Sequence, residues 1–185
     1  MWYFVTLCTA GRKCVLGDVM QDAIRLSPIG EIAARTWLWL PQQFPRVHLG
    51  GWILMPNHLH GIIGLADDAG GSRAAPTVNA TSVHKPLTQI IGAFKTRSTK
   101  EINALSKSPG EQFWQRSFYD HIVRDEQDLA RIREYIRTNP QKWSLDEENP
   151  ANWQSQRRLL TRNLRSLRAL IPLRARLFRQ LAAKE

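Results

Sequence analysis

The sequence is organised around one stretch, Met55-Pro56-Asn57-His58-Leu59-His60-Gly61-Ile62-Ile63. The Pro-Asn pair predicts a turn between two strands, residues 47–54 and 58–65. Side chains alternate across a strand, so His58 and His60 share one face with Cα atoms about 6.6 Å apart, within reach of one metal ion. The alternative is that both are polar residues on the solvated side of an edge strand.

The two faces of this strand differ in composition. One face carries Leu59, Gly61, Ile63 and Leu65, and the other carries His58, His60, Ile62 and Gly64. The histidines are therefore predicted on the less apolar face.

The segments around this hairpin alternate between strand and helix patterns. Residues 2–9 are aromatic and β-branched and predict a buried strand. Ser27-Pro28 predicts a helix start, with the helix ending at Pro41, and helical spacing resumes at Leu87. Residues 113–123 predict a fourth strand.

The last helix of the pattern begins at Asp125, a cap residue, with Asp128 in the capping-box position. It ends at Asn139-Pro140, because the residue before a proline is disfavoured in helical geometry. The order is β-α-β-β-α-β followed by a helix. This order predicts an α+β fold of the ferredoxin-like kind with an antiparallel sheet.

Composition limits the class of protein. The chain has 185 residues, 43% of them hydrophobic, and no apolar run long enough to span a membrane. We expect one domain, residues 1–150, with a mobile loop at 66–86, and a basic helical extension, residues 151–185. The chain opens inside its first strand, so we expect that further residues precede it. Without a secretion signal, Cys8 and Cys14 are expected to be reduced thiols.

The net charge of +10 favours a polyanionic partner. Residues 157–185 hold nine Lys and Arg against one Glu, a net charge of +8, which leaves only +2 for the rest of the chain. An arginine-rich amphipathic helix of this kind could lie on DNA, on an anionic membrane, or against the domain with its charges in water. We favour DNA.

Tyr135 and Asn139 lie four residues apart on the last predicted helix, and so occupy one face. A tyrosine there could be a half-buried packing residue. The other interpretation is a nucleophile: beside a metal that polarises a phosphodiester, a phenol can displace a sugar oxygen and form a phosphotyrosine link.

Several motifs occur together and in order: Met55-Pro56-Asn57-His58-Leu59-His60, Phe94-Lys95, Trp114-Gln115-Arg116, Tyr119-Asp120-His121 and Tyr135-Ile136-Arg137-Thr138-Asn139-Pro140. In order and spacing they resemble the single-tyrosine (Y1) HUH transposases of the insertion-sequence 200 type. The resemblance is strongest to the REP-associated tyrosine transposases, domesticated bacterial relatives linked to repetitive extragenic palindromes. It covers roughly residues 2 to 143.

The resemblance implies roles for individual residues. His58 and His60 correspond to the histidines of the HUH motif and would bind a divalent metal, Mg²⁺ or Mn²⁺. Tyr135 matches the catalytic tyrosine, on what would be the catalytic helix. Asn139 falls at the position of a third polar metal ligand, although a helix-end cap also explains it. His121 stands in a strand motif of the subgroup, where packing or DNA contact are both open.

Residues that could contact DNA are cations and aromatic side chains, because phosphates attract the former and bases stack on the latter. The predicted DNA-binding residues are Lys95, Arg97, Trp114, Arg116 and His121. Of the other tryptophans, Trp143 and Trp153 are further stacking candidates, and Trp2, Trp37, Trp39 and Trp52 are predicted in the core.

The leading hypothesis is a metal-dependent DNA transposase, a nickase and strand transferase that acts on single-stranded or hairpin (palindromic repeat) DNA through a 5′-phosphotyrosine at Tyr135. Two alternatives stay open: a relaxase or replication-initiator nickase with the same chemistry, and a catalytically silent domesticated DNA-binding protein. We expect a bacterial cytoplasmic, nucleoid-associated protein, monomeric or homodimeric, with DNA and no membrane as its partner.

Overall fold

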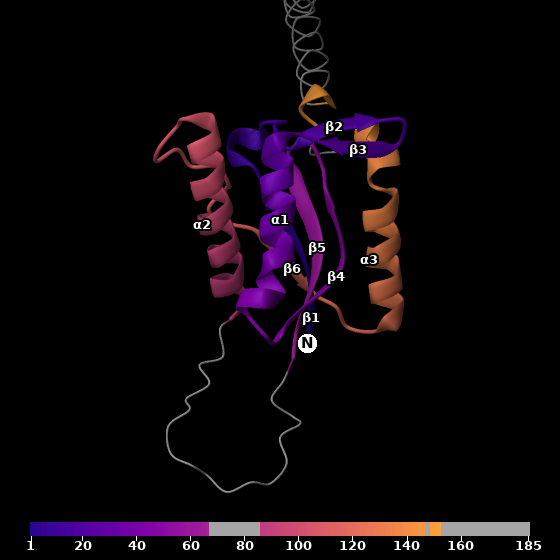
Figure 1. Ribbon diagram of the computed structural model, residues 1–185. Helices are drawn as coiled ribbons and strands as arrows, with labels where there is room; N and C mark the ends of the chain where they lie inside the picture. Colours follow the sequence, from indigo (N-terminus) through magenta and orange to yellow (C-terminus); the bar gives the residue numbers. More distant parts are fainter. Residues whose placement is uncertain (67–85, 147–148, 153–185) are drawn as a thin grey trace, which may run out of the picture. The chain divides into compact units, whose positions relative to one another are not determined.

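The computed structural model describes residues 1–66, 86–146 and 149–152 (Figure 1). The chain divides into two units, Met1–Trp143 and Ser144–Glu185. Nearly all of the predicted loop at 66–86 lies outside the described residues. Trp153 and most of the basic extension also lie outside them. In the part of the chain that is described, no helix has the length and apolar character needed to cross a membrane.

The elements of the first unit follow the predicted alternation. They are β1 (Trp2–Cys8), η1 (Ala10–Arg12), β2 (Gly17–Met20), β3 (Ala23–Leu26), α1 (Pro28–Gln43), β4 (Val47–Leu54), β5 (His58–Leu65), α2 (Leu87–Ser106), β6 (Tyr119–Ile122), α3 (Glu126–Thr138) and η2 (Pro140–Leu145), which runs past the end of the unit.

The main sheet has the strand order β4-β5-β1-β6, with every neighbouring pair antiparallel. Setting aside the small β2-β3 hairpin, the chain runs β-α-β-β-α-β with β1 and β5 at the centre. This is the predicted ferredoxin-like α+β fold, and the prediction is confirmed. Helices α1 and α2 cover one face of the sheet and α3 covers the other (Figure 1).

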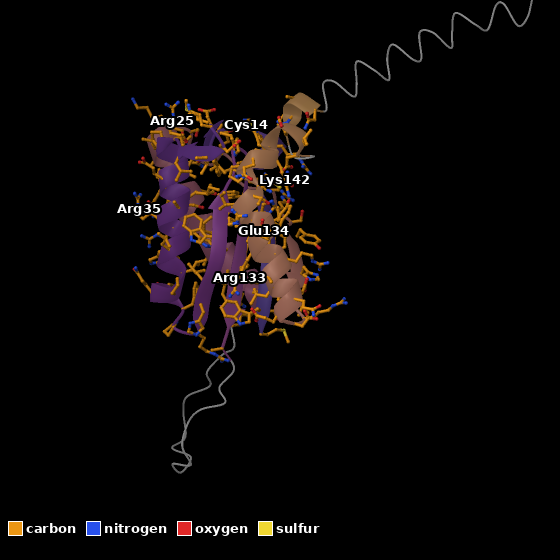
Figure 2. The ribbon with its side chains drawn as sticks, turned by 90° about the vertical axis from the view of Figure 1, so that its right-hand side faces the viewer. Cys14, Arg25, Arg35, Arg133, Glu134 and Lys142 are labelled. Carbon is orange, nitrogen blue, oxygen red and sulfur yellow. The ribbon has the colours of Figure 1, made fainter. Side chains whose placement is uncertain are left out.

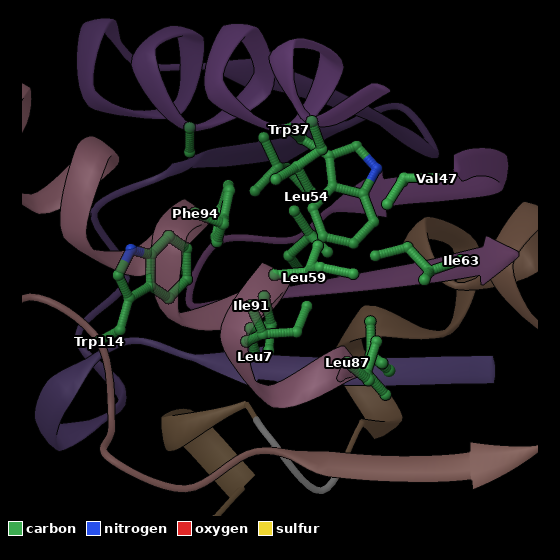
Figure 3. Close-up of a cluster of buried hydrophobic side chains, with 14 of the residues drawn as sticks. Leu7, Trp37, Val47, Leu54, Leu59, Ile63, Leu87, Ile91, Phe94 and Trp114 are labelled. Carbon is green, nitrogen blue, oxygen red and sulfur yellow. The ribbon is translucent and has the colours of Figure 1, made fainter. Parts of the chain in front are cut away.

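The face under α1 and α2 holds the larger hydrophobic core. Phe94 of α2 lies between Trp37 of α1 and Trp114, with ring centroids 5.5 and 5.3 Å away (Figure 3). Leu59 and Ile63 of β5 point into the same core. The face under α3 has a smaller buried cluster of Ile62, Ile132 and Ile136. The predicted division of β5 into two faces is therefore confirmed.

Gly61 is required by this packing. A Cβ at this position would lie 2.4 Å from the Trp37 ring, so only glycine lets α1 approach the strand directly after His60. The turn before β5 is also held tightly. Met55 N donates to His58 O at 2.7 Å, and the Asn57 carbonyl accepts from Thr9 N at 2.9 Å. The backbone that carries the histidines is thus fixed on both sides.

The prediction missed the β2-β3 hairpin, which pairs residues 17–20 with residues 23–26. The hairpin turns through Gln21 and Asp22, both at positive φ, so no glycine or proline marks the turn in the sequence. It precedes α1, whose cap is as predicted: the Ser27 side chain accepts from Gly30 N at 3.1 Å.

Three predicted boundaries need correction. Helix α1 passes through Pro41 and ends at Gln43, because a proline in the last turn loses only one hydrogen bond. The fourth strand is only Tyr119–Ile122, since the segment before it pairs through a single bridge, Thr9 with Trp114. Helix α3 ends at Thr138, close to the predicted end. The predicted reason is wrong, because Asn139, the residue before Pro140, keeps right-handed helical angles (φ −58°, ψ −43°).

Candidate active site

His58 and His60 lie on β5, an interior strand, and point from the face that α3 covers. His58 is completely buried and His60 is 4% exposed. The alternative of two solvated residues on an edge strand is therefore wrong. The ring centroids are 4.4 Å apart, so the pair can approach one small ligand from the same side.

Asn57 orients His58. Its Nδ2 donates to the Arg12 carbonyl at 3.3 Å, which leaves Oδ1 to accept from Nδ1 of His58 at 2.9 Å. An amide oxygen only accepts, so the proton of a neutral His58 lies on Nδ1 and the lone pair on Nε2. A metal-ligating imidazole needs this arrangement, with its second nitrogen anchored to an acceptor.

His60 is held at both ring nitrogens. Nδ1 lies 2.9 Å from the Thr6 hydroxyl on β1, and Nε2 lies 3.2 Å from the Tyr135 hydroxyl on α3. The Phe4 ring stacks on His60 with centroids 5.4 Å apart and meets the Tyr135 ring edge-on. Thr6 and Phe4 are site residues that the sequence did not single out, because only the β1-β5 register places them beside His60.

Burial keeps both imidazoles neutral. Burial lowers the pKa of His58 well below its ordinary 6.5, and the nearby His60 and Arg12 lower it further. Burial alone lowers the pKa of His60 to about 3. Neutral imidazoles are the form that binds metal, so the site is ready for a cation at neutral pH.

Helix α3 presents Tyr135 and Asn139 to the histidines. The Asp125 side chain caps its first turn by accepting from Asp128 N at 2.8 Å, and Ile132 and Ile136 pack against Ile62. Tyr135 reaches His60, with the hydroxyl contact above and ring centroids 5.1 Å apart. Beyond the helix end, the Trp143 ring lies 6.0 Å from the His58 ring.

Asn139 lies between Tyr135 and Trp143 in the sequence. Its side chain is buried, and it follows Tyr135 by four residues on the same helix face. Among the described residues, its Oδ1 and Nε2 of His58 are both buried without a hydrogen-bond partner. Unpartnered buried acceptors cost free energy, and each of these two atoms is of a type that can bind a cation. The predicted set of His58, His60 and Asn139 fits a divalent ion on this observation.

Carboxylates and thiols do not complete this set. Over the described ranges, no group of three or more His, Cys, Asp and Glu residues could hold a metal. Within the described residues, neither Cys8 nor Cys14 forms a disulfide. The candidate donors among the described residues are therefore two imidazoles and one amide oxygen.

His121 has a partner that the sequence did not identify. Its Nε2 lies 2.8 Å from Oδ2 of Asp128, and Oδ1 of Asp128 accepts from Arg131 at 2.6 Å. The carboxylate also accepts from Arg124 N at 3.2 Å. Asp128 is therefore at the predicted capping-box position, but its carboxylate accepts from the backbone N–H of Arg124 and not from that of Asp125, the cap residue.

The other predicted DNA-binding residues lie outside the histidine site. Lys95 donates to the carbonyls of Gln115, Arg116 and Ser117 at 2.7–3.2 Å, so its ammonium holds the segment before β6. Arg97 pairs with Glu101 at 3.2 Å and lies over the Trp39 ring. The Arg116 side chain is exposed.

Trp114 corrects one of these predictions. It is 3% exposed and its indole donates to Ser98 Oγ at 2.9 Å, so it belongs to the core and offers no face to a base. Trp2 departs from the expected core position as well, with an exposed ring. Trp37 is in the core as predicted, and Trp39, Trp52 and Trp143 are half-buried.

Comparison with known proteins identifies one relative by sequence and one similar fold. No family model matches the chain. An uncharacterised protein of Haemophilus influenzae is 33% identical over 150 residues, which cover 79% of this chain and 83% of that protein. The structure of a REP-associated tyrosine transposase bound to a REP hairpin superimposes with a TM-score of 0.53 at 18% identity, over 76% of this chain and 67% of that chain.

The sheet order and the helix over its histidine face therefore define a protein with the fold of the REP-associated tyrosine transposases. The predicted resemblance is confirmed at the level of the fold. By sequence, the chain belongs to the same family as the Haemophilus influenzae protein.

Proposed function

We propose that this chain is a metal-dependent DNA transposase that nicks and rejoins single-stranded or hairpin DNA, with Tyr135 as its nucleophile. The observation that carries the proposal is the 3.2 Å contact between the Tyr135 hydroxyl and Nε2 of His60. It brings a phenol to a pair of neutral imidazoles whose ring centroids are 4.4 Å apart, and the same helix carries the unpartnered Asn139 amide oxygen four residues after Tyr135. A packing tyrosine would need none of these neighbours.

The metal would be held by Nε2 of His58, Nε2 of His60 and Oδ1 of Asn139. A bound divalent ion polarises a phosphodiester and stabilises the charge that develops during attack. Imidazole and amide donors suit Mn²⁺, while Mg²⁺ prefers oxygen ligands and is abundant in cells, so we expect either ion to support cleavage.

In the proposed reaction the Tyr135 oxygen attacks the phosphorus of a phosphodiester. A bond forms from this oxygen to phosphorus, and the bond to the 3′ oxygen breaks. The 3′ oxygen takes up a proton while the phenol releases one, which leaves a 3′ hydroxyl and a 5′ phosphate esterified to Tyr135. Attack by another 3′ hydroxyl reverses the step and rejoins strands without a nucleotide triphosphate. Because Tyr135 lies beside His60 of its own chain, we propose that it acts in cis.

The proposed substrate follows from charge and from the structural neighbour. The net charge of +10 favours a polyanion, and the transposase of the same fold was solved bound to a REP hairpin. We propose single-stranded or hairpin DNA of palindromic repeats as the substrate, in the bacterial cytoplasm. A relaxase or replication-initiator nickase would cleave single strands with the same chemistry and stays the second enzyme candidate.

Cleavage by the Tyr135→Phe variant tests the nucleophile. In Mn²⁺, the wild-type chain should cut a labelled DNA hairpin with single-stranded flanks and remain covalently attached to the 5′ phosphate, and Tyr135→Phe should do neither. Tyr3→Phe is the matched control, since Tyr3 lies on β1 with its hydroxyl toward the Met1 sulfur at 3.0 Å, and it should cleave like wild type. Equal cleavage by wild type and Tyr135→Phe would refute the proposal.

Calorimetry with Mn²⁺ separates the enzyme from a silent DNA-binding protein. The wild-type chain should give a heat of binding that a His58→Ala/His60→Ala double variant lacks. Absence of binding by the wild type, or unchanged binding by the double variant, would favour the silent alternative.

A further inference from the structure

Tyr119 is a large aromatic residue left exposed beside the candidate active site. It lies on the edge strand β6 and is 59% exposed. Its ring contacts Phe4 edge-on, at a centroid distance of 6.4 Å. The proposed chemistry does not use it.

The strand register places Tyr119 next to the histidines. Tyr119 is directly opposite Thr6, and Thr6 is directly opposite His60, so the three side chains form a cross-strand row on the α3 face. Phe4 links the same residues from the next row, because its ring touches those of Tyr119, His60 and Tyr135. The exposed ring of Tyr119 is therefore the outer end of the row that contains the proposed metal ligand.

Arg131 provides a cation along the same side of α3. It precedes Tyr135 by four residues, one helical turn, and so lies on the same helix face. Its side chain is 78% exposed, yet Oδ1 of Asp128 holds its Nη2 at 2.6 Å. Both oxygens of Asp128 are occupied, by Arg131 and by His121 with Arg124 N, so this carboxylate positions the guanidinium while its other N–H groups remain for a ligand.

The surface next to Arg131 is concave. A cavity of about 360 Å³ is lined by His121, Arg124, Asp125, Gln127, Asp128 and Arg131. His121 follows Tyr119 by two residues on β6, so its side chain lies on the same face of the strand. His121, which lines this depression, and Tyr119 are therefore neighbours on one face of β6, and Arg131 lies on α3.

We infer that Tyr119 and Arg131 bind the DNA strand beside the bond that is cut: one base stacks on the Tyr119 ring and a flanking phosphate pairs with the Arg131 guanidinium. The inference rests on the proposed function for its ligand. An exposed aromatic ring stacks bases of any sequence, and a guanidinium held by a carboxylate is pre-organised for phosphate. Asp128 and His121 are positioning residues that keep Arg131 in place.

Binding without cleavage tests the inference. The full chain carrying Tyr135→Phe is titrated in EDTA against a fluorescein-labelled DNA hairpin with single-stranded flanks, by fluorescence anisotropy. Adding Tyr119→Ala should weaken binding by about 5- to 150-fold, the effect of losing one stacked base. Tyr119→Phe keeps the ring and should stay within about twofold of the parent.

Abasic sites identify the stacked base. One abasic site is moved stepwise along the flanks, and a single position should weaken binding to the parent but not to Tyr119→Ala. Tyr119→Leu covers Phe4 without an aromatic face and should behave like Tyr119→Ala, which separates stacking from packing. Binding by Tyr119→Leu at the parent's strength, or an equal loss at every abasic position, would overturn the inference.

Salt dependence tests Arg131. Arg131→Gln should reduce the slope of log affinity against log salt by about 0.7, the value for one phosphate contact in a single strand. The matched control is Arg133→Gln, on the same helix (Figure 2). The Arg133 guanidinium pairs with Glu126 at 3.3 Å. An equal change in slope for both variants would overturn the role of Arg131. Neither measurement needs metal or cleavage, so a Tyr135→Phe chain that still cuts DNA would refute the proposed function and leave these results unaffected.

Discussion

On the face of the sheet under α1 and α2, one apolar core joins Trp37, Phe94 and Trp114 to the strands, whereas the buried apolar cluster described under α3 consists of three isoleucines. On this second face His58 and His60 are buried as well, and so is Asn139 directly after α3. The larger apolar core thus lies on one face and the candidate active site on the other. Strand β5 belongs to both faces: its Leu59 and Ile63 pack in the larger core, and its two histidines point to the other face. The core therefore holds the strand that carries the histidines.

The core face should show the largest effect of a single substitution. Phe94→Ala removes a fully buried ring that contacts two tryptophans, and we expect it to lower the free energy of unfolding by about 3–5 kcal/mol. Urea unfolding measures this loss. Folded Phe94→Ala protein should bind Mn²⁺ with the affinity of the wild type. A weaker affinity would show that the two faces are not independent.

A smaller loss of stability, but a clear loss of metal binding, is expected on the α3 face. Ile136→Ala loosens the packing of α3 on Ile62 and should cost about 2 kcal/mol, the low end for such a truncation, because the cluster is small. Asn139 follows three residues later, so Mn²⁺ affinity should fall as well. Calorimetry on folded Ile136→Ala that gave wild-type affinity would show that α3 contributes no ligand.

The contact between Tyr135 and His60 predicts competition within the site. The phenol occupies Nε2 of His60, the atom that would bind metal, so metal binding must break this hydrogen bond. Its net value is about 0.5–1.5 kcal/mol, and Tyr135→Phe should therefore bind Mn²⁺ up to about tenfold more tightly. Tyr3→Phe should match wild type in the same titration. Weaker binding by Tyr135→Phe would mean that the phenol supports the metal.

The smallest effect is expected at Asp128, at the rim of the α3 face. Hydrogen bonds from His121 and Arg131 lower the pKa of its carboxyl to about 2, from 3.8. A depressed folded-state pKa adds stability that is present above pH 3.8 and is lost as the pH falls toward about 2. The melting temperature of Asp128→Asn should therefore fall less between pH 4 and 2 than that of wild type, and parallel curves would contradict this assignment.

The elements on both faces could be predicted where local signals are strong. Alternation in β5, the Ser27 and Asp125 caps and the apolar stripe of α2 each depend on neighbours along the chain. The β2-β3 hairpin could not be predicted, because its turn residues at positive φ are Gln21 and Asp22. Trp114 was predicted to stack on DNA and is instead buried, because a distant segment supplies the Ser98 acceptor of its indole. The three carbonyls that accept from Lys95 also come from a distant segment, so the sequence did not indicate them.

By itself, the sequence determined the residue types of the site and the faces they occupy: two histidines at spacing two on a strand, and a tyrosine and an asparagine at spacing four on a helix. These are consequences of backbone periodicity, which is local. Only the tertiary structure decided that the two faces meet, that Asn57 sets the tautomer of His58, and that Thr6, Phe4 and Tyr119 join the row. Those contacts depend on strand register and helix packing between segments far apart in the chain, which local periodicity does not encode.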